Sequence, residues 1–399
     1  MRGIEGKNIV LGVCGGIAAY KCAELVRLID KEEAVVRVIM TNNAKKFIGS
    51  ITFEALTHQM VCSDLFTGTD NAVIRHIQWA RKADAVIIAP ATANILGKMA
   101  NGIADDALST FLLAVTAPLL ICPSMNTYMY ESQAVQRNLK RLESDGHYIL
   151  EPGQGKLACG TIGPGRLPEP ELIVDRLISH LTIKDFMGVR ILVTAGPTCE
   201  AIDPVRHISN PSTGKMGYAL AIAAERRGAD VTLISGPTHL SDPLNVEVVH
   251  VQNTAEMADA VFARLDQTQV VVKAAAVSDY RPGSMATHKI KKKEETMILE
   301  LVRNLDILKE IGWRKKDQIV VGFAAETQDL NKNAALKLKE KRLDMIVGNL
   351  IGTDDSGFKA DTNQVTLFHK DGRVEPLPMM NKLTVAHCIL DRIQAIGKE

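Results

Sequence analysis

The sequence predicts an α/β protein built from two doubly wound, Rossmann-like domains. Short and nearly continuous apolar runs alternate with longer stretches of helical periodicity, and this alternation starts twice, at Asn8 and again at Val189. Apolar runs of this kind are typical of parallel strands that helices cover on both faces. The 399 residues also suffice for two domains of ordinary size.

The first half contains apolar runs that predict strands. These lie at residues 8–13, 35–40, 85–89, 119–123 and 148–150. Between the first two runs, apolar residues at helical spacing predict a helix over 17–31. A further helix is expected at 171–181, followed by a linker at 179–188. We therefore divide the chain into residues 1–187 and 188–399.

The second half shows the same alternation without a visible sequence repeat. Its expected strands lie at residues 190–195, 231–235, 246–251, 270–276, 319–323 and 345–347. A helix is expected at 219–227, between the first two strands. The Lys-rich stretch 282–295 lacks the periodicity of a strand or a helix, and it predicts a long loop.

Composition and charge exclude several classes of protein. Lys and Arg number 47 against 46 Asp and Glu, so the formal net charge is +1, and neither nucleic acid nor a membrane is an expected partner. No apolar run approaches the ~20 residues of a membrane helix. The seven cysteines contain no CxxC pair, which argues against a zinc ribbon or a disulfide framework. With no secretory signal visible, we expect a cytoplasmic enzyme.

Three loops of small or polar residues follow strands in the first half. They lie at residues 12–20, 41–44 and 90–94. Because the carboxyl ends of parallel strands meet at one edge of a sheet, these loops should converge on one crevice. Small residues there let backbone N–H groups approach a phosphate at a helix N-terminus. The pattern is not the GxGxxG signature of dinucleotide-binding domains.

Four segments of the first half together resemble the flavin-binding cysteine decarboxylase family. They are GGIAAYK (15–21), PATANILGKMANGIADDALST (90–110), PSMNTYMY (123–130) and ACGTIGPGRLPEP (158–170). The resemblance implies a flavodoxin-like fold that binds flavin mononucleotide (FMN) and decarboxylates the cysteine end of a peptide-like substrate. Members fused to a second domain act on 4′-phosphopantothenoylcysteine. The implied FMN contacts are Gly15, Gly16, Ile17, Thr41, Thr92, Ala93, Asn94 and Ser124.

The same resemblance implies three catalytic residues. Direct loss of CO2 would leave an unstabilised carbanion, and a flavin avoids this by oxidising the substrate thiol to a thioaldehyde. Cys159, on a Gly-rich flap, would then supply a proton. His76 would act as a base or contact the substrate carboxylate, and Asn126 would hydrogen-bond that carboxylate. Taken singly, a His or a Cys is usually structural. We interpret the following cysteines in that way: Cys14, Cys22, Cys62, Cys122 and Cys388.

A second set of motifs lies beyond residue 188. The turn Ser212-Thr213-Gly214-Lys215 offers hydroxyls, N–H groups and a cation to a phosphate, but it is not a Walker loop. Together with AAAVSDYRP (274–282), KIKK (289–292) and VGFAAET (321–327), it resembles the phosphopantothenate–cysteine ligase signature. This resemblance extends to the end of the chain.

The ligase resemblance implies activation of the phosphopantothenate carboxylate by CTP, followed by attack of cysteine on the acyl-cytidylate. Lys residues and a divalent ion, Mg²⁺ or Mn²⁺, would counter the developing charge, with Asp279 and Asp306 as metal contacts. Asn210 would bind or activate the acyl intermediate, and Lys289 would serve the cysteine step. The implied CTP contacts are Lys273, Ala274, Ala275, Asp279, Lys289, Asn304, Leu305, Asp306, Ile307, Phe323, Lys337 and Lys341.

The chain departs from the two family patterns in a few places. The flap reads Thr161-Ile162 where many decarboxylases carry an acidic residue, Cys199 stands where the ligases usually have Arg, and Thr213 replaces the commoner Ser. Outside its context, the stretch 288–293 would be a solvated basic loop.

The sequence argues against two other functions. Intact Cys159, His76 and Asn126 argue against a non-catalytic flavin-binding regulator. The absence of GxGxxG in the second half argues against a nicotinamide-dependent oxidoreductase.

The sequence therefore predicts a bifunctional enzyme of coenzyme A biosynthesis. The second domain would make 4′-phosphopantothenoylcysteine from small-molecule substrates, and the first would decarboxylate it to 4′-phosphopantetheine. The resemblance also implies trimeric decarboxylase units and paired ligase domains. Because a neighbouring subunit would shield the flavin from water, we expect a homo-oligomer, a dodecamer of such trimers.

Overall fold

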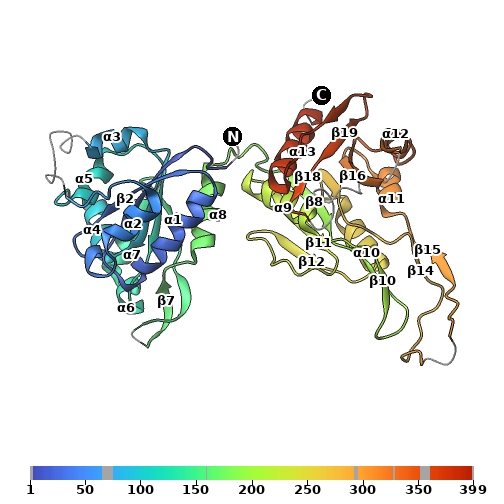
Figure 1. The fold of residues 1–399 in the computed structure, drawn as a ribbon, viewed down its shortest axis with the longest axis horizontal. Coiled ribbons are helices and arrows are strands. Elements are labelled where there is room, and N and C mark those ends of the chain that lie inside the picture. The colour runs from blue at the N-terminus through green and yellow to red at the C-terminus, as the bar shows by residue number, and fades with distance from the viewer. Residues whose placement is uncertain are drawn as a thin grey trace. The chain divides into compact units, whose positions relative to one another are not determined.

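A computed structural model of the chain describes residues 3–64, 75–158, 160–291, 295–326, 329–350 and 360–397. The chain forms two compact units, Met1–Thr182 and Ile183–Glu399 (Figure 1). The boundary expected after residue 187 lies just beyond this division. Within the described residues, no helix is both long and apolar enough to cross a lipid bilayer.

The first unit is built on a parallel sheet in which every strand expected from the sequence is present. The strand order is β2-β1-β3-β4-β5. The strands are β1 (Asn8–Val13), β2 (Val35–Met40), β3 (Ala85–Ala91), β4 (Leu119–Pro123) and β5 (Tyr148–Ile149). The order reverses between β1 and β3, which is the switch point where sheets of this type bind ligands.

Helices cover both faces of this sheet, so alternate residues of β1 are buried on opposite sides. Leu11 packs with α1 and α8, whereas Val10 packs in a second cluster with α4 and α5. The helix expected over 17–31 begins as a 3₁₀ turn, η1. The helical segments are η1 (Ile17–Tyr20), α1 (Lys21–Lys31), η2 (Ala44–Lys46), α2 (Ser50–Thr57), α3 (Arg75–Lys82), α4 (Ala93–Asn101), α5 (Ala107–Ala114), α6 (Thr127–Glu131), α7 (Gln133–Ser144) and α8 (Pro170–Leu181).

A hairpin that the apolar pattern did not predict follows the first sheet. Its strands are β6 (Gly153–Lys156) and β7 (Ile162–Arg166), which pair antiparallel. Both are rich in glycine and poor in apolar residues, so no strand periodicity marks them.

The second unit contains an eight-stranded sheet of order β12-β11-β8-β13-β16-β17-β19-β20. The strands from β12 to β17 are parallel, and their order is that of a dinucleotide-binding sheet. The two remaining strands add antiparallel at one edge. The strands are β8 (Arg190–Ala195), β11 (Asp230–Ser235), β12 (Glu247–His250), β13 (Val270–Lys273), β16 (Ile319–Glu326), β17 (Met345–Leu350), β19 (Val365–His369) and β20 (Val374–Pro376).

Three details of the second unit correct the sequence expectations. Strand β13 ends at Lys273 rather than at residue 276, because the chain then follows the β8 loop, where the Ala276 N–H donates to Gly196. The edge strands β19 and β20 were not expected at all. The stretch 282–295 is not wholly a loop, because Pro282 ends strand β14 (Tyr280–Pro282), which pairs with β15 (Leu301–Arg303). Figure 1 shows this two-stranded arm, in orange, reaching away from the sheet.

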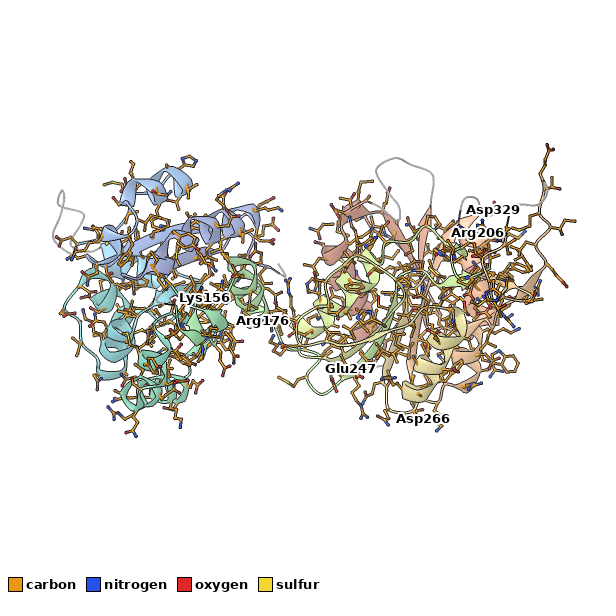
Figure 2. All side chains as sticks on the ribbon, turned by 90° about the horizontal axis from the view of Figure 1, so that it is seen from below. Lys156, Arg176, Arg206, Glu247, Asp266 and Asp329 are labelled. Carbon is orange, nitrogen blue, oxygen red and sulfur yellow. The ribbon has the colours of Figure 1, made fainter. Side chains whose placement is uncertain are left out.

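Two helical layers complete the second core. One face of the sheet packs against α9 (Lys215–Arg226) and α13 (Lys382–Ile396), and the other against α10 (Thr254–Leu265), α11 (Ile307–Arg314) and α12 (Leu330–Glu340). Short strands lie outside the sheet: β9 (Cys199–Ala201) with β10 (His207–Ser209), and β18 (Thr362–Asn363) with β21 (Met380–Asn381). Figure 2 shows side chains filling the space between the sheet and these layers.

Candidate active sites

A cavity of about 500 Å³ lies at the carboxyl edge of the first sheet. Loops that follow β1, β2, β3 and β4 form its walls. The three loops that the sequence analysis expected to converge on one crevice are those after β1, β2 and β3. The cofactor contacts expected from the sequence line it, except for Ile17, whose side chain is 62% exposed. The lining residues are Gly15, Gly16, Thr41, Asn42, Asn43, Thr92, Ala93, Asn94, Ile95, Lys98, Asp106, Ser124, Met125 and Met129.

Gly15 is fixed by a close approach between two of these loops. A Cβ atom at position 15 would lie 2.4 Å from the Asn43 Cβ and 2.8 Å from the Asn43 carbonyl carbon. At Gly16 the nearest atom to such a Cβ is 3.8 Å away. Glycine is therefore required sterically at position 15, whereas position 16 would accept a methyl group.

The start of α4 makes the cavity suitable for an anion. The Thr92 hydroxyl caps this helix by accepting from the Ile95 N–H at 3.4 Å, and the first residues of the helix line the cavity. A helix N-terminus carries unsatisfied N–H groups and partial positive charge, which favour a phosphate. Burial raises the pKa of the neighbouring Cys14 thiol to about 12, so Cys14 stays protonated, in keeping with its expected structural role.

The sequence analysis missed an ion-pair cluster in this cavity. Lys98 contacts Asp105 at 2.5 Å and Asp106 at 2.6 Å. Burial alone would lower the pKa of Lys98, but the hydrogen bonds to both carboxylates raise it. Asp106 also caps α5 through the Ser109 N–H. The two Asp residues seven and eight positions after Lys98 were the available signal, since both lie in the segment quoted for the resemblance.

The β6–β7 hairpin is anchored on the wall of the same cavity. The Gly165 carbonyl accepts from the Met125 N–H at 3.0 Å and from the Ser124 hydroxyl at 3.3 Å. A Cβ atom at Gly165 would lie 2.1 Å from the Met125 carbonyl oxygen, and its φ of +134° also favours glycine. Asn126, which follows Met125 in the chain, caps α6. Its Nδ2 also donates to the hydroxyl of Thr161, in the turn of the hairpin, at 3.5 Å.

Two of the expected catalytic side chains, those of Cys159 and His76, lie outside the described part of the structure. Cys159 lies outside the described residues, but its neighbours Leu157 and Gly160 belong to the turn that joins β6 to β7. Position 76 falls in α3, and the side chain of His76 is likewise outside the described part.

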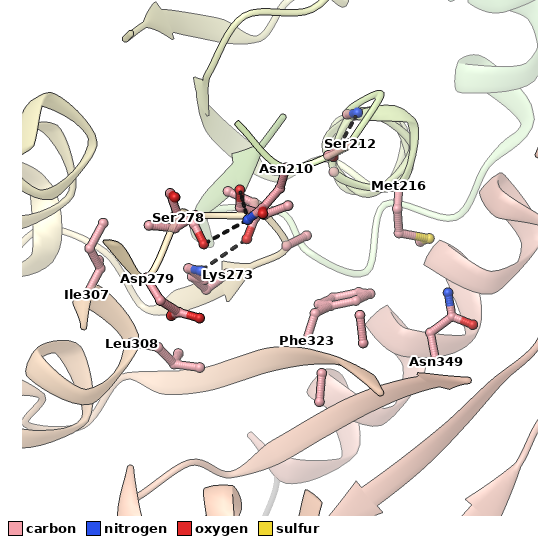
Figure 3. A pocket seen from close by; sticks show the side chains of 18 of the residues that line it. Asn210, Ser212, Met216, Lys273, Ser278, Asp279, Ile307, Leu308, Phe323 and Asn349 are labelled. Carbon is pink, nitrogen blue, oxygen red and sulfur yellow. Dashed lines mark hydrogen bonds between the residues drawn. The ribbon is translucent and has the colours of Figure 1, made fainter. Parts of the chain in front are cut away.

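A second cavity, of about 400 Å³, lies at the carboxyl edge of the second sheet (Figure 3). Asn210 and all the expected nucleotide contacts except Lys289 line it: Lys273, Ala274, Ala275, Asp279, Asn304, Leu305, Asp306, Ile307, Phe323, Lys337 and Lys341. The Ser212–Lys215 turn lines it as well. These residues come from β13 and β16, from the loops after β10 and β13, from the starts of α9 and α11 and from the C-terminal end of α12, so the fold brings together segments distant in sequence.

Charged groups of both signs surround Lys273. Burial and the nearby Lys341 lower the pKa of Lys273 to about 8, although Asp306 and Asp279 act in the opposite direction. Lys341 pairs with Asp306 at 2.8 Å. Burial would raise the pKa of Asp306, but hydrogen bonds from Lys341 and from the Lys309 N–H hold it below its ordinary value. Lys273 is thus a cation that gains from a bound phosphate.

The two asparagines of the predicted site are held by hydrogen bonds to the backbone. Asn210 donates from Nδ2 to the carbonyls of Ala276 and Val277 at 3.2 and 3.1 Å (Figure 3). Asn304 donates from Nδ2 to the Ser278 carbonyl at 2.9 Å and to the Thr254 hydroxyl at 3.2 Å. Asn304 therefore fixes the loop after β13 in place.

The structure places Lys289 outside the second cavity. Its side chain is exposed, on the arm that joins β14 to β15. The adjacent Ile290 is tied to the β9–β10 turn, because its N–H donates to Asp203 at 3.1 Å and its carbonyl accepts from Arg206 at 3.1 Å. Arg206, labelled in Figure 2, also pairs with Asp203 at 2.9 Å. These hydrogen bonds fix the position of the arm at Ile290, the residue after Lys289.

The second cavity suits a Mg²⁺ ion that is bound partly by the protein and partly by the phosphates of a nucleotide. Within the described ranges, no cluster of three or more His, Cys, Asp or Glu residues could hold a metal. Asp279 and Asp306, which both line the cavity, offer two carboxylates. Mg²⁺ commonly takes one or two carboxylates and completes its shell with water and substrate phosphates.

Sequence reasoning also missed three residues of the second cavity, which lie in β17, in β18 and at the start of α13. Lys382, Asn349 and Asn363 line the second cavity but lie outside every motif. Cys199, at the departure from the ligase pattern, is buried, and its Sγ lies 3.6 Å from the Ser209 hydroxyl.

Comparisons with known proteins cover the whole chain. A family model described as "Flavoprotein" matches residues 2–182, and one described as "DNA/pantothenate metabolism flavoprotein C-terminal domain" matches residues 186–396. The chain is 50% identical to the coenzyme A biosynthesis bifunctional protein CoaBC of Bacillus subtilis, over 99% of this chain and 98% of that protein. It is 44% identical to the protein of the same name from Vibrio cholerae, over 98% and 99%.

Two solved structures each match about half of this chain. The C-terminal domain of a coenzyme A biosynthesis bifunctional protein CoaBC is 43% identical, with a TM-score of 0.47, and covers 54% of this chain and 98% of its own. A PPC decarboxylase mutant complexed with pantothenoylaminoethenethiol is 30% identical, with a TM-score of 0.39, and covers 43% of this chain and 97% of its own.

Proposed function

Because this chain belongs to the family of the coenzyme A biosynthesis bifunctional protein CoaBC, we propose that it performs both a ligation and a decarboxylation. The second unit would join cysteine to 4′-phosphopantothenate at the expense of CTP. The first unit would decarboxylate the resulting 4′-phosphopantothenoylcysteine to 4′-phosphopantetheine. The observation that carries this proposal is that each unit has a cavity at the carboxyl edge of its sheet. The expected FMN contacts except Ile17 line the first cavity, and the expected nucleotide contacts except Lys289 line the second.

The first cavity fits the phosphate of FMN. Gly15 has no side chain, so its backbone is open to a phosphate on the cavity side, and the start of α4 supplies N–H donors. When bound, the flavin would supply the two-electron oxidation of the substrate thiol. Asn126 would hold the substrate carboxylate, with His76 as base or second contact. Cys159 would return a proton to the substrate. Strand β7 of the adjacent hairpin is hydrogen-bonded to Ser124 and Met125 on the cavity wall.

The second cavity supports the two half-reactions of the ligase. The phosphopantothenate carboxylate would attack the α-phosphorus of CTP and release pyrophosphate, and the cysteine amine would then displace CMP. Lys273, Lys337 and Lys341 offer positive charge to the phosphates, and Asp279 and Asp306 would hold Mg²⁺, or Mn²⁺ in its place. Asn210, oriented by two backbone carbonyls, would contact the acyl group.

One incubation tests both activities. Purified protein is given 4′-phosphopantothenate, cysteine, CTP and Mg²⁺, and pyrophosphate, CMP and CO2 are followed together. All three should form in equal amounts. Supplying 4′-phosphopantothenoylcysteine without CTP should release CO2 alone. Release of CO2 without FMN in the protein, or adduct formation without CTP, would contradict the proposal.

We further propose that the protein acts as a homo-oligomer, with trimeric decarboxylase units and paired ligase domains in a dodecamer. Support comes from large apolar side chains exposed on segments that adjoin the first cavity. Ile17 is 62% exposed, Tyr128 74% and Ile162 81%. Exposed apolar side chains of this size favour association, and a neighbouring subunit packed against these segments would shield the flavin from water. Light scattering that gives a monomeric mass for the fully active protein would contradict this assembly.

A further inference from the structure

Two charged residues of the first unit's motifs have no part in the proposed reaction, yet they pair with each other. Lys21 ends the segment GGIAAYK, and Glu169 lies near the end of the segment ACGTIGPGRLPEP. The Lys21 ammonium group donates to both carboxylate oxygens of Glu169, at 2.8 Å each. The pair thus joins two motifs at positions 148 residues apart.

Lys21 lies next to the first cavity without lining it. It is the first residue of α1 and follows η1 directly, and the N-cap of η1, Gly16, lines the cavity. The Lys21 side chain is only 15% exposed. Because burying a charge is costly unless an opposite charge compensates it, the carboxylate of Glu169 fixes where this ammonium group can lie.

Glu169 lies at the C-terminal end of the β6–β7 hairpin. It follows Arg166, the last residue of β7, by three positions and is the N-cap of α8, but its carboxylate does not cap that helix. The Arg166 guanidinium lies 3.8 Å from the same carboxylate. Arg166 also reaches across the hairpin, since its Nη1 would lie 3.0 Å from a Cβ atom at Gly155 of β6. Glu169 therefore lies between a cation of the hairpin and a cation of α1.

The hairpin is attached to the rest of the unit at two separate places. Hydrogen bonds from residues 124–127 hold the carbonyls of Pro164 and Gly165. These donors belong to one short segment, so by themselves they would let the hairpin rotate about that segment. The contact between Lys21 and Glu169 adds an attachment to a different element, and two attachments together fix the direction in which the hairpin extends.

Apolar packing, rather than the ion pair, holds helix α8 in place. Helices α1 and α8 pack against each other (Figure 1), and the buried Leu167 joins their core from the segment between β7 and α8. Removal of the Lys21 charge should therefore leave the fold intact. It would free the exposed carboxylate of Glu169, and with it the Arg166 side chain that faces it.

We propose that Lys21 is a positioning residue of the decarboxylase, which acts through Glu169 to fix the direction of the β6–β7 hairpin. Cys159 lies between β6 and β7 in the sequence. A small rotation of the hairpin at its attached end displaces the opposite end, and proton transfer tolerates little displacement of the donor. The inference rests on the proposed decarboxylase function.

The step that depends on this position is the return of the proton. The S–H bond of Cys159 breaks, a C–H bond forms at the substrate carbon that has lost CO2, and the cysteine is left as a thiolate. The two electrons that the substrate gave up earlier come back from the flavin. Oxidation and loss of CO2 precede this step, so they should not depend on Lys21.

The test is Lys21→Met in the full-length protein loaded with FMN, because Met keeps the buried aliphatic stem and removes the charge. Rapid mixing with 4′-phosphopantothenoylcysteine should bleach the flavin at the wild-type rate, whereas the yellow colour should return about tenfold more slowly. Mass spectrometry should find an oxidised enethiol product beside 4′-phosphopantetheine. FMN content should not change. Lys21→Arg should restore the rate, since a guanidinium can contact both carboxylate oxygens.

A double-mutant cycle separates the pair from its members. Glu169→Gln should slow the return of colour as much as Lys21→Met does, and the double variant should be no slower than either. Arg27→Met is the matched control, because Arg27 lies on the same helix and is 67% exposed in a surface pair with Glu24. It should behave as wild type.

Three results would overturn the inference: an unchanged return of colour in Lys21→Met, equal slowing of bleaching and return, or loss of FMN from this variant. The second would indicate a general structural defect, and the third a role in cofactor binding. A wild-type protein that neither bleaches nor releases CO2 with 4′-phosphopantothenoylcysteine would instead refute the decarboxylase function.

Discussion

Lys341 and Asp306 form an ion pair at 2.8 Å on the wall of the second cavity, where Asp306 also caps the first turn of α11. One carboxylate thus serves the helix and the site. The Lys that approaches it from α12 also helps to lower the pKa of Lys273. A substitution of Asp306 should therefore lower both the free energy of unfolding of the second unit and its affinity for the nucleotide.

Asp306→Asn should destabilise the second unit modestly. Asn caps helices as well as Asp does, so the variant isolates the ion pair. Because the Asp306 side chain is 45% exposed, solvent screening limits the expected loss to about 0.5–1 kcal/mol at pH 7. The folded pKa lies below its ordinary value, so this stability is present above about pH 4 and is lost as the pH falls further. Urea unfolding at pH 7 and pH 3 measures the difference, and an equal gap at both pH values would contradict it.

Lys273 should give the ligase a pH limb near 8. The charged form, which attracts phosphate, predominates below its pKa of about 8 and disappears as the pH rises through that value. We expect kcat/KM for CTP to fall tenfold per pH unit above it. Lys273→Arg keeps its charge throughout this range and should remove the limb. A profile of the variant that still falls near pH 8 would assign the limb to another group.

Gly15→Ala should impair flavin binding through a steric clash. The added methyl group would lie 2.4 Å from the Asn43 Cβ, so the loops after β1 and β2 must separate at a cost of about 1–3 kcal/mol. FMN content, read from absorbance after gel filtration, should drop several-fold. Gly16→Ala is the control, because its methyl group has no neighbour closer than 3.8 Å. Equal flavin content in the two variants would mean that the loop contact is not decisive.

Cys159→Ser should separate oxidation from reprotonation in the first unit. A hydroxyl is a far weaker acid than a thiol, so decarboxylation should continue while the return of the proton stalls. The variant should bleach its yellow flavin on addition of substrate and accumulate an oxidised enethiol product, seen by mass spectrometry. Cys388→Ser, in the other unit, should behave as wild type. A normal yield of 4′-phosphopantetheine from Cys159→Ser would refute the assignment.

Lys289→Gln should block the cysteine step and spare CTP activation. Lys289 is exposed in the structure, so this role requires bound substrate to enclose its side chain, and loss of the charge there would cost ~3–4 kcal/mol, or a few hundredfold in rate. Pyrophosphate should still form, and the acyl-cytidylate should accumulate. Lys291→Gln removes a neighbouring exposed Lys on the same arm and should leave both steps intact. Loss of pyrophosphate release would place Lys289 in activation, and wild-type rates would make the Lys run a solvated loop.

The parallel strands could be predicted because each is buried on both faces. Continuous apolar runs such as the one ending at Val13 reflect that double burial directly. The hairpin that ends at Arg166 and the edge strand that begins at Val374 follow no such pattern, because their residues are mostly exposed or glycine. The apolar pattern of a sequence indicates which residues are buried. It does not indicate a strand that is held only by backbone hydrogen bonds to its neighbour.

The candidate sites could be predicted only as far as motifs reach. Asn210 and Asp279 lie in quoted segments and line one cavity. Lys382 lies in no motif, and the pairing of β18 with β21 next to it and the packing of α13 on α9 place it at the cavity wall. Lys289 lies in a motif, yet the tie between Ile290 and Asp203 holds its loop away from the cavity of its own chain. Proximity that long-range pairing creates leaves no local pattern in the sequence.

The contact of the β6–β7 hairpin with Met125 divides the flap into positions where a substitution would disturb the cavity wall and positions where it would not. At Gly165 any side chain would collide with the backbone that lines the cofactor cavity. At Ile162, by contrast, 81% of the side chain faces solvent. Substrate preference can thus diverge near the turn without disturbing the flavin. The Thr161-Ile162 departure from the decarboxylase pattern falls in this permissive part.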